Sequence, residues 1–435
     1  MKSARILVIF LLAIGIFGML VTDALLYSRL TYLGTLIVIL SWFWARVSLS
    51  GIEVTRRSRS LRANVGDIFD EHYDVLNKNR WPCPWIEIRN ETNMPYAAGS
   101  RMLTGLGGMH RRTYVGRTWL TQRGSFLLGP TTIRTGDPFG LFQRSKNFSS
   151  EETLIVLPML VDVTSFTAPP GLLPGGQIVR QKALGITPHA ASIREYAPGD
   201  ALRRIHWPTT ARRGKLMVKE YDQDPQAEVW LFLDAERAIQ ASLKTDTIQP
   251  WDGWMLGRKP DFELPPSTIE YGVTIAASLA HYFNSQRRAV GLVAAGQVNI
   301  AISADRSIRQ EEKILETLAF VQGEGELSLA GLVAAQAGQL LQGSSVVLIT
   351  SSVRFEVMHA VDDLLRRNLH PTVVLLDADS FGGPAGSDVL VASLQKVNVP
   401  VCHVRCGANL AASLSSLAVN YSYQEKAQWF EPSIH

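Results

Sequence analysis

Two long apolar runs near the N-terminus constrain the fold of this chain more than any other feature. Residues 6–22 hold no charged side chain, and residues 30–47 hold only Arg46, near their end. Each run approaches the roughly 20 residues with which an α-helix crosses a bilayer. Because only a few residues separate the runs, we predict a transmembrane helical hairpin within residues 1–49, with helices at residues 6–26 and 30–47.

The positions of the lysines and arginines predict how such a hairpin is oriented. Lys2 and Arg5 precede the first run and the arginines of residues 46–62 follow the second, whereas the link between the runs holds only Arg29. The positive-inside rule places both ends of the hairpin in the cytoplasm. We therefore expect a multi-pass protein of the inner (plasma) membrane whose N-terminus and large C-terminal region are cytoplasmic. The arginines of residues 56–62 are expected to contact anionic headgroups.

The composition narrows the class of protein. A chain of 435 residues has room for two or three domains. The net charge is only +4, which gives no sign of nucleic-acid binding, and we expect none. Three cysteines, an odd number, do not suggest a disulfide framework and fit a reducing compartment. Cys402, His403 and Cys406 lie close together in sequence but are too few for a structural zinc site.

Residues 50–158 are typical of a small all-β, sandwich-like domain. Short apolar patches separated by turn signals lie at residues 85–88, 113–115, 125–128 and 131–133. This alternation of strand-forming and turn-forming stretches predicts short strands joined by tight turns. Asp137 lies in a Gly-Asp-Pro sequence, and we expect its side chain to form a turn rather than to act as a catalytic acid.

Residues 226–435 show a different pattern, in which buried strands alternate with helices. Apolar strand candidates lie at residues 229–233, 289–294, 346–350, 372–376 and 399–404, and helical stretches at residues 268–288, 308–320 and 354–367. Such alternation predicts a doubly wound α/β domain with a parallel sheet covered on both faces. Ligands of such sheets bind beyond the carboxyl ends of the strands. Asp234, Ser351 and Asp377 are expected at that edge.

Between these regions, residues 159–225 form a connector that ends in an unusual stretch, which we call the signature segment (residues 194–221). It mixes Arg, Asp, His, Trp and Lys without a sustained helical or strand period. Pro198 and Gly199 predict a turn, with Asp200 as the N-cap of a short helix over residues 201–207 that ends before Pro208. Residues 215–221 are expected to form a strand.

The charges of the signature segment allow two interpretations. Five arginines flank three acidic residues, so the segment either binds an anion or acidic partner or forms an internal ion-pair network. His206 is the one candidate general base, but no Ser or Cys nucleophile motif lies near it, so we expect no catalytic residue here. The residues of the predicted binding surface are Arg194, Glu195, Tyr196, Gly199, Asp200, Arg203, Arg204, His206, Trp207 and Arg212.

The signature segment resembles the domain-of-unknown-function-58 family of bacteria and archaea. The resemblance extends upstream and covers most of the chain. The matching stretches are Arg194-Glu195-Tyr196, Pro198-Gly199-Asp200, Arg203-Arg204-Ile205-His206-Trp207, Thr210-Ala211-Arg212, residues 216–220, residues 123–130, residues 136–142 and Val156-Leu157-Pro158.

The C-terminal half also resembles a von Willebrand factor type A domain, which often follows the signature in that family. Such domains hold a divalent metal with an Asp-x-Ser-x-Ser element after the first strand. Here Asp234 is kept, but Glu236 and Ala238 replace the two serines. A hard cation needs several oxygen ligands, and only Asp234 and Glu236 are apparent. We expect no cofactor, with Mg²⁺ on these two residues as the alternative.

The resemblance implies a function through protein partners. Proteins of this family are commonly encoded near MoxR-type AAA+ ATPases and transglutaminase-like membrane proteins. We therefore expect a non-enzymatic, membrane-anchored cytoplasmic scaffold or adaptor that serves such an ATPase in protein maturation or cell-envelope processes. The alternatives are a hydrolase-like enzyme that uses Asp200 and His206, and a divalent-metal-dependent adhesion module.

Overall fold

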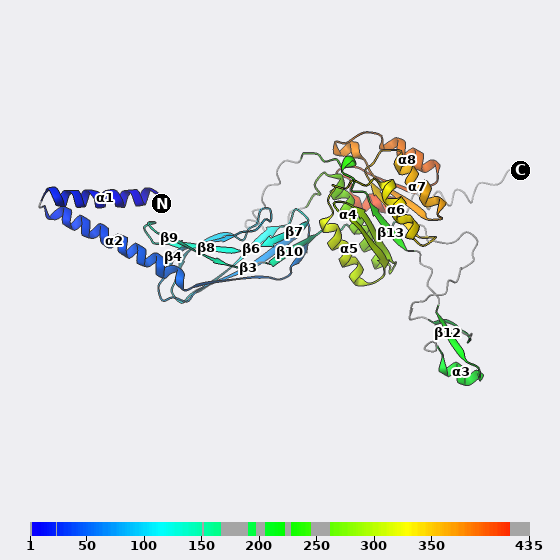
Figure 1. Ribbon diagram of the computed structural model, residues 1–435, viewed down its shortest axis with the longest axis horizontal. Helices are drawn as coiled ribbons and strands as arrows, with labels where there is room; N and C mark the ends of the chain where they lie inside the picture. The colour runs from blue at the N-terminus through cyan, green and yellow to red at the C-terminus, as the bar shows by residue number, and fades with distance from the viewer. Residues whose placement is uncertain are drawn as a thin grey trace. The chain divides into compact units, whose positions relative to one another are not determined.

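The computed structural model describes most of the chain (Figure 1). The chain forms two compact units. The described residues are 2–22, 24–149, 152–166, 190–196, 205–221, 228–244 and 262–417. One unit comprises residues 1–160, 244–265 and 315–320, and the other comprises residues 161–243, 266–314 and 321–435. Gly199, Asp200, Arg203 and Arg204 of the predicted binding surface lie outside the described residues.

Two apolar helices open the chain, as the sequence predicts, but the link between them was misplaced, because the first helix ends at Val21 and not at residue 26, and the second begins at Leu25 and not at residue 30. α1 spans Lys2–Val21 and α2 spans Leu25–Ser50, and both are long and apolar enough to cross a membrane. The two helices approach closely at glycines. A Cβ added to Gly15 would overlap Thr31, and one added to Gly34 would overlap Leu12. Close approach at glycines is a common way for membrane helices to pack.

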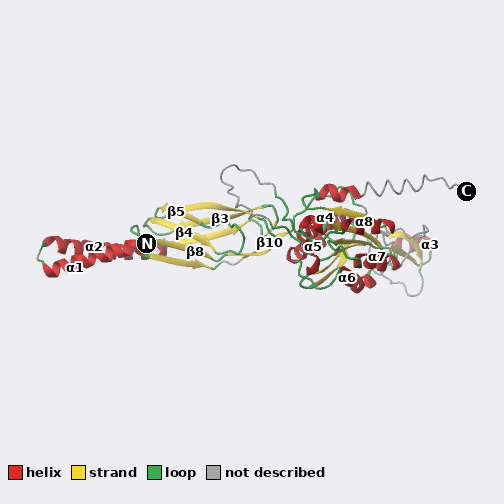
Figure 2. Cartoon of the chain, turned by 90° about the horizontal axis from the view of Figure 1, so that it is seen from above, coloured by secondary structure: helices red, strands yellow, loops and turns green. Residues whose placement is uncertain are grey.

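A region of short strands follows the hairpin, and Figure 2 shows it as yellow strands and green loops. Its strands are β1 (Ile52–Ser58), β2 (Arg62–Asn64), β3 (Ile68–Asn77), β4 (Cys83–Asn90), β5 (Arg101–Leu106), β6 (Arg111–Trp119), β7 (Gly124–Leu128), β8 (Thr131–Gly136), β9 (Gln143–Phe148) and β10 (Glu152–Leu157). They form three sheets with the orders β1-β3-β6, β2-β10-β7 and β5-β4-β8-β9. All four predicted apolar patches lie in strands, which confirms the expected β-rich region.

Residues from both the hairpin and the strands build the core of this region. Leu49, near the end of α2, packs with Ile52 of β1 and with buried residues of β3, β4 and β8. Ser41, Ala45 and Ser48 of α2 are buried as well. One side of the last part of α2 is therefore covered by protein, and the helix connects the apolar hairpin to the strands without an intervening linker.

A buried arginine joins the three sheets of the β-rich region. The guanidinium of Arg56, on β1, lies 4.0 Å from the carboxylate of Glu71 on β3, and their side chains are 1% and 0% exposed. Arg56 also donates to the Asn90 side chain on β4 at 3.3 Å and to the carbonyl of Leu128 on β7 at 2.7 Å. Burial raises the pKa of Glu71, and the positive charge of Arg56 opposes that rise.

The expectation that residues 56–62 contact headgroups was wrong for Arg56. The strand alternation of β1 turns Arg56 into the protein, whereas its neighbour Arg57 is exposed. The guanidinium of Arg62 makes an ion pair with Glu316. The sequence could not distinguish a surface arginine from a buried one, because that distinction depends on partners in distant strands.

The α/β domain contains a six-stranded sheet with the order β15-β14-β13-β16-β17-β18. Its strands are β13 (Val229–Leu233), β14 (Val290–Ala295), β15 (Asn299–Asp305), β16 (Ser345–Thr350), β17 (His370–Leu376) and β18 (Val401–Val404). Its helices are η2 (Arg237–Ile239), α4 (Thr268–Ser285), α5 (Ile308–Phe320), α6 (Leu329–Gln336), η3 (Ala337–Gln339), α7 (Glu356–Arg366), η4 (Ala378–Phe381) and α8 (Ser387–Lys396). The predicted parallel strands are confirmed, and the antiparallel edge strand β15 is an addition.

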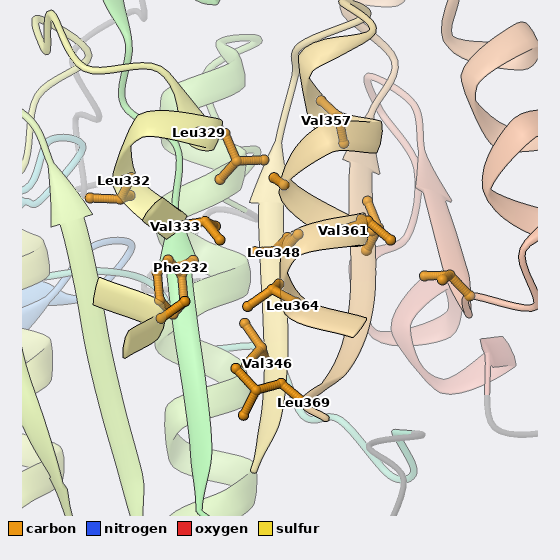
Figure 3. Close-up of a cluster of buried hydrophobic side chains, with 14 of the residues drawn as sticks. Phe232, Leu329, Leu332, Val333, Val346, Leu348, Val357, Val361, Leu364 and Leu369 are labelled. Atoms are coloured by element: carbon orange, nitrogen blue, oxygen red, sulfur yellow. The ribbon is translucent and has the colours of Figure 1, made fainter. Parts of the chain in front are cut away.

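Helices pack on both faces of this sheet. Phe232, Val346 and Leu348 point from the strands toward apolar residues of α6 and α7 (Figure 3). On the opposite face, the backbone of α4 at Gly272 lies against Leu233 and Ile349. The alternation of side chains along each strand thus supplies one apolar face for each layer of helices.

The described part of the signature segment forms a two-stranded sheet and one short helix. β11 (Ala190–Glu195) pairs antiparallel with β12 (Met217–Tyr221), which confirms the predicted C-terminal strand, and α3 spans Trp207–Arg213. The predicted helix over residues 201–207 was wrong at its end. Ile205 forms a β-bridge with Val218, and the helix begins at Trp207 with Pro208 in its first turn. Proline is favoured there because the first turn needs no amide donor.

We predict that Arg56→Met lowers the free energy of unfolding by about 3–5 kcal/mol, because it leaves the buried Glu71 without its cation. Arg57→Met, at the exposed neighbouring position of β1, is the matched control and should change the free energy of unfolding little. Chemical unfolding of the full chain in detergent measures both. The double variant Arg56→Met/Glu71→Met should be more stable than Arg56→Met alone. Equal stability of the two Arg→Met variants would contradict the role of this pair.

Candidate functional site

The structure describes six of the ten predicted surface residues of the signature segment. One of the six, Arg194, is described only in its backbone. Arg194 pairs with Val218 in the β11–β12 sheet. Glu195 and Trp207 are exposed, and Tyr196 and His206 are half-buried. The exposed Arg212 lies in the last turn of α3, beside the equally exposed Arg213. The segment therefore presents these side chains from one small module of two strands and a helix.

His206 holds this module together. Its ring nitrogen Nδ1 shares a 2.7 Å hydrogen bond with the hydroxyl of Thr209. Its backbone amide donates to the carbonyl of Met217 at 2.8 Å, and its own carbonyl accepts from Thr209 and Thr210. The Thr210 hydroxyl in turn accepts a hydrogen bond from the Met217 amide. These bonds fix the start of α3 against β12 and give His206 a structural role.

The outer surface of the module is aromatic and basic. Trp207 is 66% exposed, which is unusual for so large an apolar side chain. Arg212 and Arg213 lie at the carboxyl end of α3, where the helix dipole favours cations. The ion pair between Glu195 and Lys215 is itself exposed, at 65% and 68% of the side chains, so it stabilises little. Among the described residues of the signature segment, the one ion pair between Glu195 and Lys215 is thus at the surface and not internal.

A second group of polar residues lies at the carboxyl edge of the parallel sheet, where the sequence predicts ligand sites. Asp234, which follows β13, is only 4% exposed. One of its carboxylate oxygens accepts a 2.7 Å hydrogen bond from Thr350, and the other accepts from the amide of Glu236 at 3.3 Å. Glu236 in turn makes a 2.8 Å ion pair with Arg354.

The other residues expected at this edge are also engaged within the protein. Ser351 donates to the carbonyl of Ile239 at 2.9 Å. Asp377, which follows β17, accepts a 2.7 Å hydrogen bond from Ser387 and lies 3.4 Å from the guanidinium of Arg405. The edge is therefore polar and ordered by the protein itself. Sequence reasoning missed Arg354 and Arg405, because cations that follow a strand carry no motif.

These contacts bear on metal binding at Asp234 and Glu236. The described residues contain no group of three or more His, Cys, Asp or Glu side chains able to hold a metal ion. The guanidinium of Arg354 already supplies a positive charge to Glu236, and Thr350 occupies one oxygen of Asp234. A divalent cation prefers about six oxygen ligands. The residues present thus fit an internal cation better than a metal ion.

Burial has a clear effect on the ionisation of Asp234. Loss of water around the carboxyl raises its pKa to about 7, while the hydrogen bonds from Thr350 and the Glu236 amide partly oppose the rise. An aspartate usually titrates near pH 4. Asp234 thus changes its charge close to neutral pH.

Comparison with known proteins assigns the signature segment. Residues 192–247 match the family described as "Protein of unknown function DUF58". In this stretch the chain is similar to the DUF58 family. Over 116 residues the chain is 31% identical to "Uncharacterized protein YeaD" of Bacillus subtilis (strain 168). That match covers 26% of this chain and 28% of the relative.

Solved structures give only distant likenesses. The CARDB domain of a Pyrococcus furiosus protein, in complex with di-metal ions, has a TM-score of 0.18 at 12% identity and covers 24% of this chain and 87% of that domain. A chain from the complex of zinc 2-glycoprotein with prolactin inducible protein from human seminal plasma has a TM-score of 0.19 at 10% identity. The match covers 24% of this chain and 92% of the matched chain. Scores this low carry no conclusion about fold or function.

We predict that Asp234→Asn changes the pH dependence of stability. Because folding raises the pKa of Asp234 from about 4 to about 7, the wild-type free energy of unfolding should fall between these pH values, by an amount on the order of 4 kcal/mol. An asparagine at this position cannot ionise, so the variant should lack this fall. Chemical unfolding of the full chain in detergent at about pH 4.5 and about pH 8 measures how far the free energy of unfolding changes between these pH values in the wild type and in the variant. Asp388→Asn, at an 84% exposed side chain, is the control, and identical pH profiles for the two variants would refute the assignment.

Proposed function

We propose that this protein is a membrane-anchored cytoplasmic scaffold or adaptor that docks a partner protein through its signature segment. The observation that carries the proposal is the contrast within the described residues of that segment. The polar groups suited to catalysis are used to build the module, as with His206 and Thr209. The aromatic and cationic groups, Trp207 and Arg212, are exposed. Tryptophan and arginine are the residue types most enriched at binding hot spots.

The hairpin is proposed to cross the inner (plasma) membrane twice. Its two open ends lie on the same side, because the Arg5 side chain near the start of α1 donates to the carbonyl of Leu141 and the end of α2 packs in the core of the strands. The β-rich region therefore lies beside both ends. The excess of Lys and Arg at these ends supports a cytoplasmic location.

The order of the α/β sheet supports a finer proposal for its fold. From the central strand β13, the strands run outward as β14-β15 on one side and β16-β17-β18 on the other. This is the doubly wound order, here with one antiparallel edge strand. We propose that the domain is von Willebrand factor type A-like, with Arg354 replacing the usual metal charge beside Glu236.

The proposed partner is a MoxR-type AAA+ ATPase, with a transglutaminase-like membrane protein as a second member of the assembly. The resemblance of the sequence to its family is the basis of this proposal, and the chemistry of the signature segment supports it. A surface that presents Trp207, Arg212 and Arg213 fits an acidic partner surface with an apolar pocket. Protein maturation or a cell-envelope process is the proposed setting.

We predict that Trp207→Ala/Arg212→Ala weakens binding of the full chain to a purified MoxR-type ATPase by about tenfold or more, because both side chains are exposed anchors. Light-scattering or surface-plasmon binding in detergent measures the affinity. The matched control is Ile308→Ala/Arg309→Ala, which removes an exposed apolar residue and an exposed arginine at the start of α5.

A wild-type chain that shows no affinity for the ATPase would exclude this partner. Binding that both double variants weaken equally would instead exclude the signature segment as its docking surface. A thermal unfolding curve of each variant shows that the fold is retained.

The orientation of the hairpin is tested by labelling. In a Cys406→Ser background, where the remaining Cys83 and Cys402 are buried, we predict that Ala24→Cys reacts with an impermeant maleimide in sealed right-side-out vesicles. Ala24 lies in the link between the helices, on the proposed outer side. Gln122→Cys, exposed in the β-rich region, should react only after the vesicles are opened. The reverse pattern would place the large C-terminal region outside.

A further inference from the structure

The pairing of α1 and α2 locates the bilayer boundary on the hairpin. Leu12 lies opposite Gly34 and Gly15 opposite Thr31, so an antiparallel register places Arg5 opposite Ser41. The 26 residues of α2 extend over about 39 Å, which exceeds the roughly 30 Å apolar core of a bilayer. From Ser41 onward one side of α2, at Ser41, Ala45, Ser48 and Leu49, is buried by protein. The boundary therefore lies close to Arg5 and Ser41.

Side chains that favour a membrane–water interface gather at this level. Trp42 is 48% exposed, and the guanidinium of Arg46 lies 5.7 Å from its ring centre. Trp44 makes an edge-to-face contact at 5.9 Å with Trp81, which is 52% exposed. Tryptophan is enriched at the headgroup level of membrane proteins. The β-rich region thus meets the boundary from its own side, through the loop between β3 and β4.

The loop between β8 and β9 reaches the same level. The Arg5 side chain donates to the carbonyl of Leu141 at 2.6 Å, and α2 packs against both β8 and β9. Asp137 fixes the loop, because its two carboxylate oxygens accept from the amides of Phe139 and Phe142 at 2.9 Å and 2.6 Å. Phe139 itself is 57% exposed. The ring of Phe139 is therefore exposed on a loop whose backbone is fixed by hydrogen bonds, and it is available for contact with a surrounding molecule.

Positive charge accompanies this ring on β9. Arg144 and Lys146 are exposed, and β9 is the edge strand of its sheet. In residues 136–148 the sole acidic side chain is Asp137, which is buried and occupied by backbone amides. The surface of the loop and strand is therefore aromatic and cationic, which complements anionic headgroups.

We propose that the β8–β9 loop and β9 form a lipid-contacting surface, with Phe139 at the headgroup boundary and Arg144 and Lys146 on anionic phospholipids of the bilayer that the hairpin crosses. The inference rests on the proposed membrane crossing of the hairpin. Because Arg56 is buried, this surface is proposed as a site of headgroup contact in place of that arginine. It would fix the β-rich region against the membrane.

Quenching of a fluorescent label tests the proposal in the full chain. An environment-sensitive fluorophore is attached at Phe139→Cys, Leu127→Cys or Leu36→Cys in the Cys406→Ser background, and each chain is reconstituted into phosphatidylglycerol–phosphatidylcholine vesicles that contain brominated lipid. Leu36, on α2, is 55% exposed, and Leu127, on β7 beyond the other end of β8, is 40% exposed. We expect the label at residue 36 to be quenched strongly, that at residue 139 to be quenched clearly, and that at residue 127 to be unaffected.

The outcomes separate this inference from the hairpin itself. If the label at residue 139 behaves like that at residue 127 while that at residue 36 is quenched, the lipid-contacting surface is refuted and the crossing stands. If the label at residue 36 is not quenched, the crossing fails as well.

The cationic part of the surface has its own test. Spin-labelled phosphatidylglycerol should associate with the reconstituted chain more than spin-labelled phosphatidylcholine, and Arg144→Gln/Lys146→Gln should lower that preference by about twofold or more. Arg57→Gln/Arg59→Gln, at exposed positions elsewhere in the β-rich region, should leave it unchanged. Equal loss in both variants, or no preference in the unmodified chain, would overturn the assignment of anionic lipid to β9.

Discussion

The N-terminal half of the molecule depends on helix α2. This one continuous helix exposes apolar side chains over its first part and packs against the strands of the β-rich region over its last part. Its first part exposes the large apolar side chains of Leu26, Leu33 and Leu36, which suits the proposed contact with lipid. Its last part carries the small residues Ser41, Ala45 and Ser48, over which strands can pack closely. Leu49 then enters the core of the β-rich region. The anchor and the first folded region are thus joined without a flexible linker.

Two acidic side chains in the described residues, Glu71 and Glu236, are each neutralised by an arginine from another element. Arg56 and Glu71 pair among the three sheets, and Glu236 and Arg354 pair at the edge of the parallel sheet. Asp234 differs from these two pairs, because its hydrogen-bond partners are a hydroxyl and an amide rather than a cation. That difference explains why burial moves its pKa so far, and it makes the edge sensitive to pH near neutrality.

Much of the fold could be predicted from the sequence where the signal was local. Run length and apolar content indicated the two helices, and the buried strands β13, β14, β16 and β17 were recognisable as short runs rich in Val, Leu and Ile. The edge strand β15 was missed because its exposed face interrupts the apolar run. The helix of the signature segment was misplaced because Pro208 either ends or begins a helix, and only the β-bridge of Ile205 decides between them.

The sequence by itself determined the properties that depend on neighbouring residues: two spans fit for a membrane, an alternation of strands and helices, and a turn built on Asp137. Tertiary structure alone decided which polar residues meet. Arg5 and Leu141 are 136 positions apart, and Asp234 and Thr350 are 116 apart. Such contacts follow from how strands order themselves in a sheet and how helices pack, and the free energy that selects them comes from burial of the whole core. The exposure of Trp207 and Phe139 was decided in the same way, since a large apolar side chain is assigned to core or surface only by what packs around it.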